Sequence, residues 1–561
     1  PGRRAKNVRP RAGNASRRRT VVQLLPASPP PGAPLSCGAN SQGKVDAAGH
    51  PGERMNDYRY DDRTVQGFIL SSLFWGVVGI LIGLLISVQM WAPAANWAPY
   101  LTFGRLRAVH TNGLAFGLGV GAIFGIAYYI TMRLTKRPLV FPRLARLQLW
   151  LFNVGIAAAL VTLLMGYTQS LEYAEMEWPL DIAIVVLWVM FAVNVIGTII
   201  VRREEQMYVS LWYILATVVG VAVLYVVNNL SIPAGLLKSY HLFAGVNSAN
   251  VQWWYGHNVV GFVFTMPILA MFYYFLPKAT GLPIFSHRLS IVAFWSLVFA
   301  YLWTGAHHLV YTPLPDWIQT VGIVFTLFLI APSWGSVVNG YYTIGEDWTK
   351  MRSSYLTKFF VAGITFYGLQ TVQGPTQALR VVSQLIHYTD WVPGHVHMGT
   401  MGWVALTVTA SVYYVVPRMY GTEIYSERIA DAHFWLVLVG QLVFSITMWI
   451  TGIQQGAMWK ATGAGGTLKY TFMEGLAKNY PYWHLRTLGG WAGDLDLLLL
   501  RRTPGFELAL ESARSALAVF LVMAGIGLVI LVEPPNAWWV AGDIESGDWR
   551  PTALAAGLAA I

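Results

Sequence analysis

The sequence predicts an all-α protein, a polytopic membrane bundle of about twelve transmembrane helices. Of its 561 residues, 55% are hydrophobic and only 12% are charged, and the mean hydropathy is positive, at +0.48. Long apolar runs recur from Gly67 nearly to the end of the chain. Spans that share one bilayer pack as one bundle, so we expect a single membrane domain without internal repeats.

Eleven apolar runs are long enough to be read as spans, since a helix needs roughly 20 residues to cross a bilayer. In chain order they cover residues 67–91, 111–132, 147–167, 179–201, 208–229, 252–277, 288–310, 317–340, 355–379, 395–416 and 432–452. A twelfth span is expected at 513–532, and the topology of 463–512 stays open. We therefore divide the chain into a leader at 1–54, a bundle at 55–460 and a C-terminal part at 461–561 that contains the last span.

The leader carries most of the positive charge. It holds ten Lys and Arg residues and two Asp and Glu residues, which make +8 of the formal net charge of +11. It lacks hydrophobic periodicity and the uninterrupted apolar core of a signal peptide. We interpret it as disordered, or as sequence upstream of a misplaced start; the alternative is a polybasic tail that binds anionic lipid or nucleic acid. The charge gives no reason to expect nucleic acid as a partner of the bundle.

Charge also orients the bundle. Basic residues cluster after the even-numbered spans, whereas the loop after the third span carries Glu172, Glu175 and Glu177. By the positive-inside rule the N-terminus is cytoplasmic and the odd-numbered spans run outward. Six histidines then share the outer side of the membrane, and scattered structural histidines would have no reason to do so. They are His110, His257, His307, His308, His395 and His397.

His395 and His397 lie two residues apart at the start of an apolar helix. At ~100° per residue their imidazoles leave about 200° apart, so one helix can serve two metal centres. His110 is the expected partner of one of them, because two axial imidazoles make a six-coordinate haem, whereas one leaves an open position for chemistry. We assign His110 and His397 to the first type and His395 to the second. Periodicity alone does not decide which of the two pairs with His110.

The adjacent pair His307 and His308 predicts a copper site. On a helix they diverge by ~100°, which can place two nitrogens on one metal, and His257 can complete a trigonal set from the next helix. A polar side chain in a bilayer is costly without a partner, and three nitrogens with an open position suit copper. Tyr301 lies seven residues before His308 and within ~20° of the same face, so its phenol can point toward the metal.

Other histidines and the single cysteine limit the chemistry further. We interpret five histidines as loop or helix-end residues that bind no metal: His241, His287, His387, His433 and His484. The only cysteine, Cys37, lies in the leader. The bundle therefore has no disulfide, iron–sulfur cluster, dicopper thiolate centre or cysteine-attached haem, and other subunits must bring electrons to it.

At these residues the chain resembles the catalytic subunit of the cbb-type cytochrome c oxidases, the C-family of haem–copper oxygen reductases. The resemblance covers roughly residues 58–478 and rests on four motifs, at 107–113, 253–258, 301–308 and 387–397. Other branches of the superfamily place the redox tyrosine four residues after the first copper histidine, where this chain has Gly261.

The resemblance implies a haem–copper oxidase subunit I fold and a terminal oxidase that reduces dioxygen to water with electrons from cytochrome c, coupled to proton uptake and translocation. It implies two haems b and one copper ion. His110 and His397 would ligate the low-spin haem and His395 the high-spin haem, while His257, His307 and His308 would hold the copper. Tyr301 would be the redox-active tyrosine, joined covalently to His257. The implied partners are membrane-anchored subunits with c-type haems, and the implied location is the bacterial inner membrane.

Two departures from the family pattern stand out. Where the family has a glutamate before Gly-Pro in the ninth span, this chain has Gln373, and the C-terminal hundred residues match poorly. The alternatives are a nitric oxide reductase of the same superfamily, which would need non-haem iron and carboxylate help, a haem b relay linked to quinol, and a metal transporter. The histidine motifs contain no glutamate, which disfavours the reductase, and a relay needs no open site.

Overall fold

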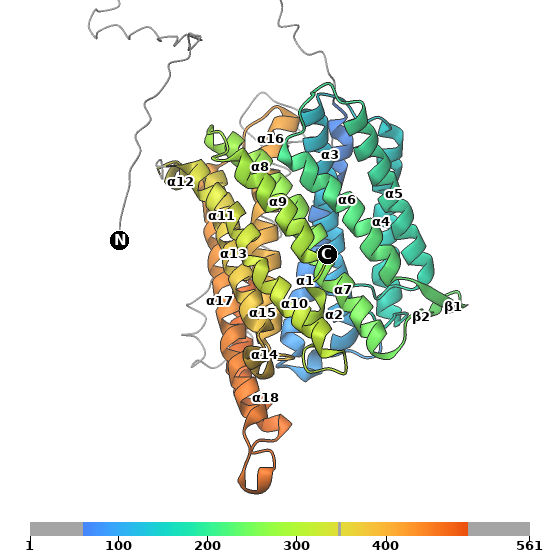
Figure 1. Cartoon of the computed structure of the whole chain (residues 1–561), viewed down its shortest axis with the longest axis vertical. Coiled ribbons are helices and arrows are strands. Elements are labelled where there is room, and N and C mark those ends of the chain that lie inside the picture. The colour runs from blue at the N-terminus through green and yellow to red at the C-terminus, as the bar shows by residue number, and fades with distance from the viewer. Residues whose placement is uncertain (1–59, 346–348, 492–561) are drawn as a thin grey trace, which may run out of the picture. The chain divides into compact units, whose positions relative to one another are not determined.

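The computed structural model describes residues 60–345 and 349–491, which form a helical bundle (Figure 1). Its first half comprises long helices, two short 3-10 or π segments and one β-hairpin. In chain order these are α1 (Asp62–Gln89), η1 (Pro93–Ala95), α2 (Phe103–Asn112), η2 (Gly113–Val120), α3 (Gly121–Thr135), α4 (Pro142–Met165), α5 (Trp178–Ile200), α6 (Val209–Asn228), β1 (Ser231–Gly235), β2 (Lys238–His241), α7 (Gly245–Phe264) and α8 (Met266–Thr280). The two strands pair antiparallel.

The second half is helical throughout, and its long spans are interrupted more often. It comprises α9 (His287–Tyr301), η3 (Gly305–Leu309), α10 (Asp316–Phe328), α11 (Ile330–Ile344), α12 (Thr349–Ser353), α13 (Tyr355–Ala378), α14 (Arg380–Ile386), α15 (Trp391–His397), η4 (Met398–Ala405), α16 (Leu406–Tyr420), α17 (Glu427–Lys460), η5 (Ala464–Gly466) and α18 (Phe472–Trp491).

The prediction of a polytopic helical bundle is confirmed. Each of the eleven expected spans up to residue 452 falls on a helix or on consecutive helical segments. Within the described residues, ten helical stretches are long and apolar enough to cross a membrane. Helix α13, with 24 residues, is the expected ninth span, but it is not among these ten. The expected span at 513–532 lies outside the described residues, while α18 supplies a helix in the region that the sequence left open.

Two spans contain a π-helical stretch that helical periodicity did not predict. The first, η2, begins three residues after His110, and the second, η4, begins directly after His397. The π-helix is rare and often lies at functional sites. In η2 glycine permits the wider turn to pack closely, since a Cβ added at Gly117 would lie 2.6 Å from the Cβ of Trp75 on α1.

Local signals in the sequence explain where several spans end and begin. Helices α8 and α16 end in glycines with left-handed backbone, Gly281 at φ 69° and Gly421 at φ 67°, a conformation that glycine adopts without strain. The next helices, α9 and α17, begin after Ser286 and Ser426 respectively. Each serine hydroxyl accepts a hydrogen bond from the backbone N–H of the residue three positions later. Such caps satisfy donors that the first helical turn leaves free.

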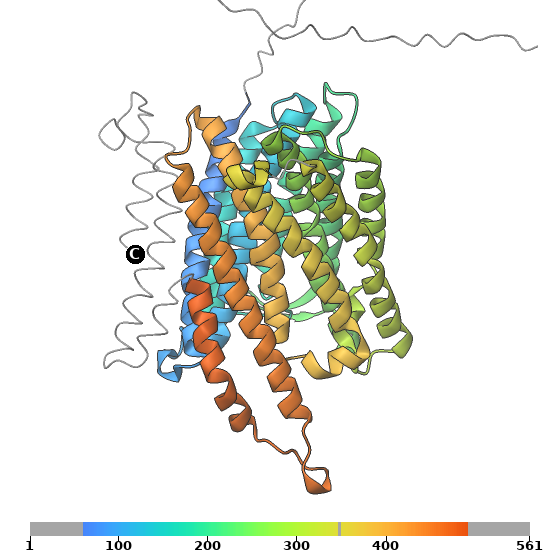
Figure 2. The ribbon, with the colours of Figure 1, turned by 90° about the vertical axis from the view of Figure 1, so that its left-hand side faces the viewer.

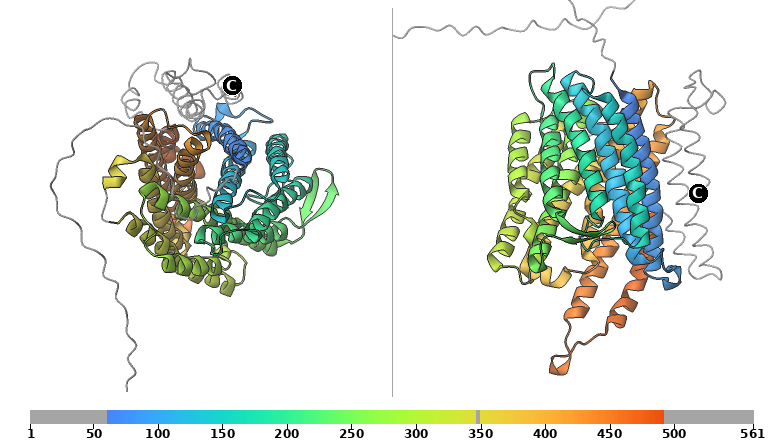
Figure 3. Two further views of the ribbon diagram at one scale, coloured as in Figure 1. Left: turned by 90° about the horizontal axis from the view of Figure 1, so that it is seen from above. Right: turned by 90° about the vertical axis from the view of Figure 1, so that its right-hand side faces the viewer.

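Helices from the two ends of the described chain pack side by side. Helix α1 contacts α18 and α16, and α17 packs along α18, so the view from above shows the last helices beside the first ones (Figure 3). With 34 residues, α17 is about 51 Å long, which exceeds the ~30 Å hydrocarbon core of a bilayer. The hairpin of α17 and α18 therefore projects beyond the other helices at one end (Figure 2).

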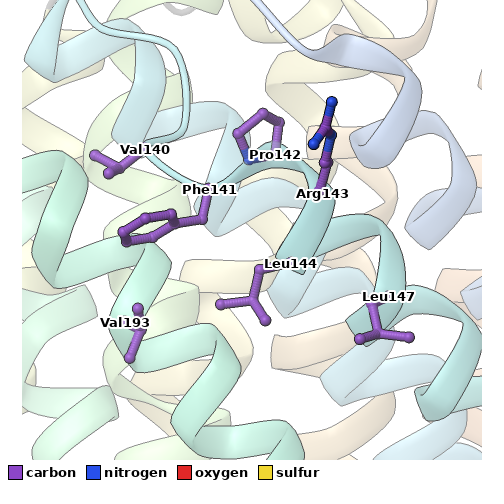
Figure 4. A pocket seen from close by; sticks show the side chains of 7 residues that line it. All are labelled: Val140, Phe141, Pro142, Arg143, Leu144, Leu147 and Val193. Atoms are coloured by element: carbon purple, nitrogen blue, oxygen red, sulfur yellow. The ribbon is translucent and has the colours of Figure 1, made fainter.

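A groove of about 590 Å³ lies at the start of α4, against α5 (Figure 4). Apart from the basic Arg143, its lining is apolar: Val140, Phe141, Pro142, Leu144, Leu147 and Val193. Phe141 and Leu147 are about half exposed, so the groove opens on the surface of the bundle. None of the candidate histidines lines this groove, so it is not the candidate functional site.

Two glycines allow α17 to pack tightly against the segment that carries His395 and His397. A Cβ at Gly452 would lie 2.3 Å from the backbone nitrogen of Trp391, and one at Gly456 would lie 1.7 Å from the carbonyl oxygen of Leu385. Residues four apart lie on the same helix face, and small residues let helix backbones approach in membranes. This contact fixes the position of α14 and α15.

We predict that Gly456→Ala destabilises the bundle by about 1–3 kcal/mol, the usual cost of overpacking. The added methyl group would clash with a backbone oxygen, which cannot rotate away. Thermal unfolding of the detergent-solubilised protein, followed by circular dichroism, measures the change. Gly104→Ala is the control, because a Cβ at this exposed helix position meets no atom within 4 Å. Equal unfolding midpoints for the two variants would contradict the packing argument.

Candidate metal centre

Three imidazoles meet where α7 and α10 pack on η3. His257 comes from α7, and His307 and His308 come from η3. One ligand nitrogen of each ring lies within 4.8 Å of those of the other two. The ring centroid of His257 lies 4.4 Å from that of His307 and 5.5 Å from that of His308. In the part of the chain that the structure describes, this is the one cluster of three or more His, Cys, Asp or Glu residues able to hold a metal ion.

Two threonines fix the tautomers of this cluster. The Thr304 hydroxyl donates to the Tyr301 carbonyl and lies 2.9 Å from His257 Nδ1, so it accepts that proton. The Thr326 hydroxyl donates to the Gly322 carbonyl and lies 2.6 Å from His307 Nδ1. A neutral imidazole that donates through Nδ1 carries its lone pair on Nε2. Both rings therefore offer Nε2 to a metal.

The backbone at the copper candidates differs from the predicted helix. His307 and His308 lie on a 3-10 turn, where successive residues diverge by about 120° rather than ~100°. His308 stacks on Trp253, with ring centroids 3.9 Å apart. Glycine makes this close packing possible, because a Cβ at Gly305 would lie 2.6 Å from the Trp253 carbonyl oxygen and one at Gly322 2.8 Å from the His307 backbone nitrogen.

Tyr301 reaches the cluster, but the predicted phase relation with His308 is wrong. Helix α9 ends at Tyr301, and three non-helical residues separate it from η3, so the two side chains do not share a continuous helix face. The Tyr301 ring centroid nevertheless lies 5.4 Å from that of His257. A Cβ at Gly261 would lie 2.5 Å from the Tyr301 ring. The missing side chain at residue 261 thus makes the room that Tyr301 occupies.

His395 and His397 have different neighbours, a point that periodicity left open. A charge on His395 would act on all three histidines of the cluster, His257, His307 and His308. His397 instead interacts electrostatically with His110 of α2. The contacts of the two rings differ as well, since His395 pairs with Gln373 of α13 and the ring centroid of His397 lies 4.5 Å from that of Phe444 on α17.

The same tautomer recurs at these histidines. His110 Nδ1 donates to the Gly79 carbonyl at 2.8 Å, and His397 Nδ1 donates to the Pro393 carbonyl at 2.7 Å. His395 Nδ1 lies 3.0 Å from the Gln373 Oε1. All three rings are only partly buried although they lie within spans. Rings with Nδ1 held and Nε2 free are the form that ligates haem iron.

The loop between α4 and α5 is tied to the helix that carries His110. Arg107 forms an ion pair with Glu172, and the Asn112 amide donates to Glu175 Oε2 at 3.2 Å. Burial raises the pKa of the Glu175 carboxyl, and hydrogen bonds, including that from Asn112, partly oppose this shift. Glu177, on the same loop, accepts a hydrogen bond from the Ser239 hydroxyl at 2.6 Å. These contacts hold α2 in place at this end of the bundle.

Arg486 of α18 is a buried cation beside His397. Its side chain is 6% exposed, its guanidinium contacts the sulfur atoms of Met90 and Met448, and it interacts electrostatically with His397. Among the described residues it forms no ion pair within 4.0 Å, although Asp390 attracts it at longer range. A buried cation needs a compensating anion, and the carboxylate edge of a haem is one that would fit.

The other five histidines of the described residues are not part of the three-histidine cluster, but three of them are not at loops or helix ends. His433 is inside α17, where it pairs with the Tyr413 hydroxyl at 3.0 Å, and His484 is inside α18, where its Nδ1 pairs with the Tyr480 carbonyl. His241 lies on β2, and His287 and His387 lie at helix ends. No periodic pattern predicts Thr304, Thr326 or Arg486, because their roles depend on packing between distant segments.

Comparison with known proteins agrees with this geometry. Residues 63–492 match the family described as "Cytochrome C and Quinol oxidase polypeptide I". The chain is 44% identical to the Cbb3-type cytochrome c oxidase subunit CcoN1 of Stutzerimonas stutzeri over 77% of this chain and 91% of that protein. It is 42% identical to the cytochrome c oxidase subunit 1 homolog of Agrobacterium tumefaciens, over 77% of this chain and 80% of the relative.

A solved structure shares the fold. It is a chain of a heme-copper terminal oxidase dimer, with a TM-score of 0.62, 18% identity, and coverage of 88% of this chain and 98% of that one. The poor match expected at the C-terminus corresponds to the end of the family match at residue 492. Membership of a haem–copper oxidase family implies haem and copper as cofactors and further subunits in the same complex. The chain therefore belongs to the cytochrome c and quinol oxidase polypeptide I family, and within it to the cbb3-type catalytic subunits.

Proposed function

We propose that this chain forms the site at which a terminal oxidase reduces dioxygen to water, with electrons that originate from cytochrome c. The proposal assigns it two haems b and one copper ion. The observation that carries it is the convergence of His257, His307 and His308, whose ligand nitrogens lie within 4.8 Å of one another. The residues 55–460 would form the catalytic bundle, and the part at 461–561 would complete it.

The donor set favours copper. All three side chains of the cluster present nitrogen, and neutral imidazoles with an open coordination position suit copper that binds a small molecule. A non-haem iron site of a nitric oxide reductase would need a carboxylate, and none belongs to this cluster in the described residues. When bound, the high-spin haem and the copper ion would supply the electrons and the open positions at which dioxygen reacts.

The two histidines of α15 would bind different haems, one for electron transfer and one for the reaction. His110 and His397 would hold the low-spin haem, because each donates its Nδ1 proton to a backbone carbonyl and keeps Nε2 for a metal. His395 would hold the high-spin haem beside the copper cluster. Since both haems depend on one short helix, the chain places an electron-transfer site next to a reaction site without a flexible connection.

Tyr301 would supply a hydrogen atom to the reaction. Its ring lies beside that of His257, in agreement with the covalent link that we expect between them. Its hydroxyl lies 3.5 Å from the Thr265 hydroxyl. Farther along the bundle the Tyr367 hydroxyl donates to Ser333 at 3.0 Å. Such buried hydroxyls can hold and pass protons, which supports proton uptake through the bundle from the cytoplasmic side.

The orientation and partners follow from the same assignment. The histidine end of the spans would face outward across a bacterial inner membrane, with a cytoplasmic N-terminus, because the basic loops lie at the opposite end. Membrane-anchored subunits with c-type haems would deliver electrons at this outer end. The bundle itself contains no cysteine, so it cannot attach such a haem through a thioether bond.

We predict that His308→Ala removes copper from the purified complex but leaves both haems in place. Two remaining imidazoles hold copper weakly, whereas the haem ligands lie on other helices. Metal analysis should give one copper per two haems b in the unmodified complex and close to none in the variant. His387→Ala is the control, since this neighbouring ring stacks on Tyr388 instead. The assignment would be refuted by copper that persists in His308→Ala, or by iron in excess of the haem content in the unmodified complex.

We also predict that Gly261→Ala lowers oxygen consumption at least tenfold, with haem and copper content unchanged. The new methyl group would displace the Tyr301 ring, and a shift of ~1 Å at a reacting group can cost about 100-fold in rate. An oxygen electrode with reduced cytochrome c as donor measures the effect. Gly340→Ala makes an equally close contact, 2.6 Å to the Phe272 ring, on α11. If both variants lose activity to the same degree, the effect is general overpacking and Tyr301 has no special role.

A further inference from the structure

Two glutamines of α13 accept hydrogen bonds from two rings of α15. Gln373 Oε1 lies 3.0 Å from His395 Nδ1, and Gln377 Oε1 lies 2.8 Å from Trp391 Nε1. The two glutamines are four residues apart on α13, and the two rings are four residues apart on α15, which is about one helical turn in each case. Two hydrogen bonds of the same kind therefore join α13 to α15. The indole N–H can only donate, and it therefore fixes the orientation of the Gln377 amide.

The orientation of the Gln373 amide follows from the role of His395. An imidazole that offers Nε2 to a metal must carry its proton on Nδ1, so the group that faces Nδ1 has to be the amide oxygen. The ring also packs against the α13 backbone, since a Cβ at Gly374 would lie 3.5 Å from His395 Cε1, an ordinary van der Waals distance. Gln373 thus holds both the ring and its tautomer.

Gln373 is the only side-chain amide among the acceptors of these histidines. His110 and His397 donate to backbone carbonyls, and His257 and His307 donate to threonine hydroxyls. A backbone carbonyl or a hydroxyl is always uncharged, whereas residue 373 could be an amide or a carboxylate of nearly the same shape. The charge of the acceptor is therefore set by the sequence at this histidine alone.

The acceptor's charge acts on the metal through the imidazole. A carboxylate would draw the Nδ1 proton strongly, increase the negative charge on the ring and stabilise ferric iron over ferrous iron. A neutral amide draws the proton less, because hydrogen bonds to charged acceptors are about twice as strong. Among the described residues, His395 forms no ion pair with a carboxylate, and its Nδ1 faces the neutral amide of Gln373.

We propose that Gln373 is a positioning residue that keeps the His395 imidazole a neutral, moderate donor and so maintains a high reduction potential at the high-spin haem. This proposal rests on the proposed function, in which His395 is the axial ligand of that haem. A high potential at the reaction site favours the arrival of electrons from the low-spin haem. Gln373 would thus tune the driving force of the internal electron transfer without contacting dioxygen.

The test compares Gln373→Glu with Gln377→Glu in the purified complex. Both variants replace an amide by a carboxylate on the same helix, but only the first faces a metal ligand. Two readouts that do not depend on turnover are used: the reduction potential of each haem by spectroelectrochemical titration, and the iron–histidine stretching frequency of the reduced high-spin haem by resonance Raman spectroscopy.

Gln373→Glu should raise the ferric-to-ferrous ratio of the high-spin haem about tenfold at a fixed potential, which is about 59 mV for one electron. It should also raise the iron–histidine frequency, because a more negative ring binds iron more strongly. The low-spin haem should be unchanged, and Gln377→Glu should leave both readouts at the values of the unmodified complex. Gln373→Leu, which removes the acceptor, should lower the iron–histidine frequency.

The proposal is overturned if Gln373→Glu leaves both readouts unchanged, or if Gln377→Glu shifts them equally. If Gln373→Glu does not assemble, Gln373→Leu decides: an unchanged frequency overturns the proposal and a lower one supports it. Failure of the proposed function would look different, since the unmodified complex would then show no iron–histidine band from a high-spin haem at all. The two failures are therefore distinguishable in one set of spectra.

Discussion

The site depends on one repeated interaction, the hydrogen bond that five of its six imidazoles donate through Nδ1. A histidine inside a bilayer is costly unless both ring nitrogens have partners. Here carbonyl, hydroxyl and amide oxygens take the Nδ1 proton at His110, His257, His307, His395 and His397. Each ring is then left with one lone pair in one direction, and under the proposed function a bound metal would be the partner that completes it.

The bundle makes these interactions possible through residues without side chains and through irregular helix geometry. Gly305 and Gly322 bring η3 against its neighbours, and Gly261 leaves the space that Tyr301 fills. The π-helical stretches η2 and η4 follow His110 and His397 directly or within three residues. Because all of these histidines except His257 lie at or near helix ends and breaks, the helices that carry them can converge more closely than regular helices of full-sized residues.

Hydropathy was sufficient to predict the eleven spans up to residue 452, since length and apolar composition are what a bilayer selects. A regular helix also predicts that the rings of His395 and His397 point in different directions, and they contact different helices, α13 and α17. Hydropathy and periodicity do not decide which of the two histidines pairs with His110, and they do not predict the 3-10 turn at His307 or the break after Tyr301. These features depend on contacts between distant segments. The same holds for Thr304, Thr326 and Arg486, which are ordinary residues until the fold brings them beside a histidine.

The most direct test of the account is a difference spectrum of the purified complex, reduced with carbon monoxide against reduced alone. Carbon monoxide binds only where an axial position is open. The account therefore predicts a signal from one of the two haems b. The second haem, held by two imidazoles, should be silent. A spectrum without any carbon monoxide signal, or with a signal from both haems, would contradict the division of labour between His395 and His397.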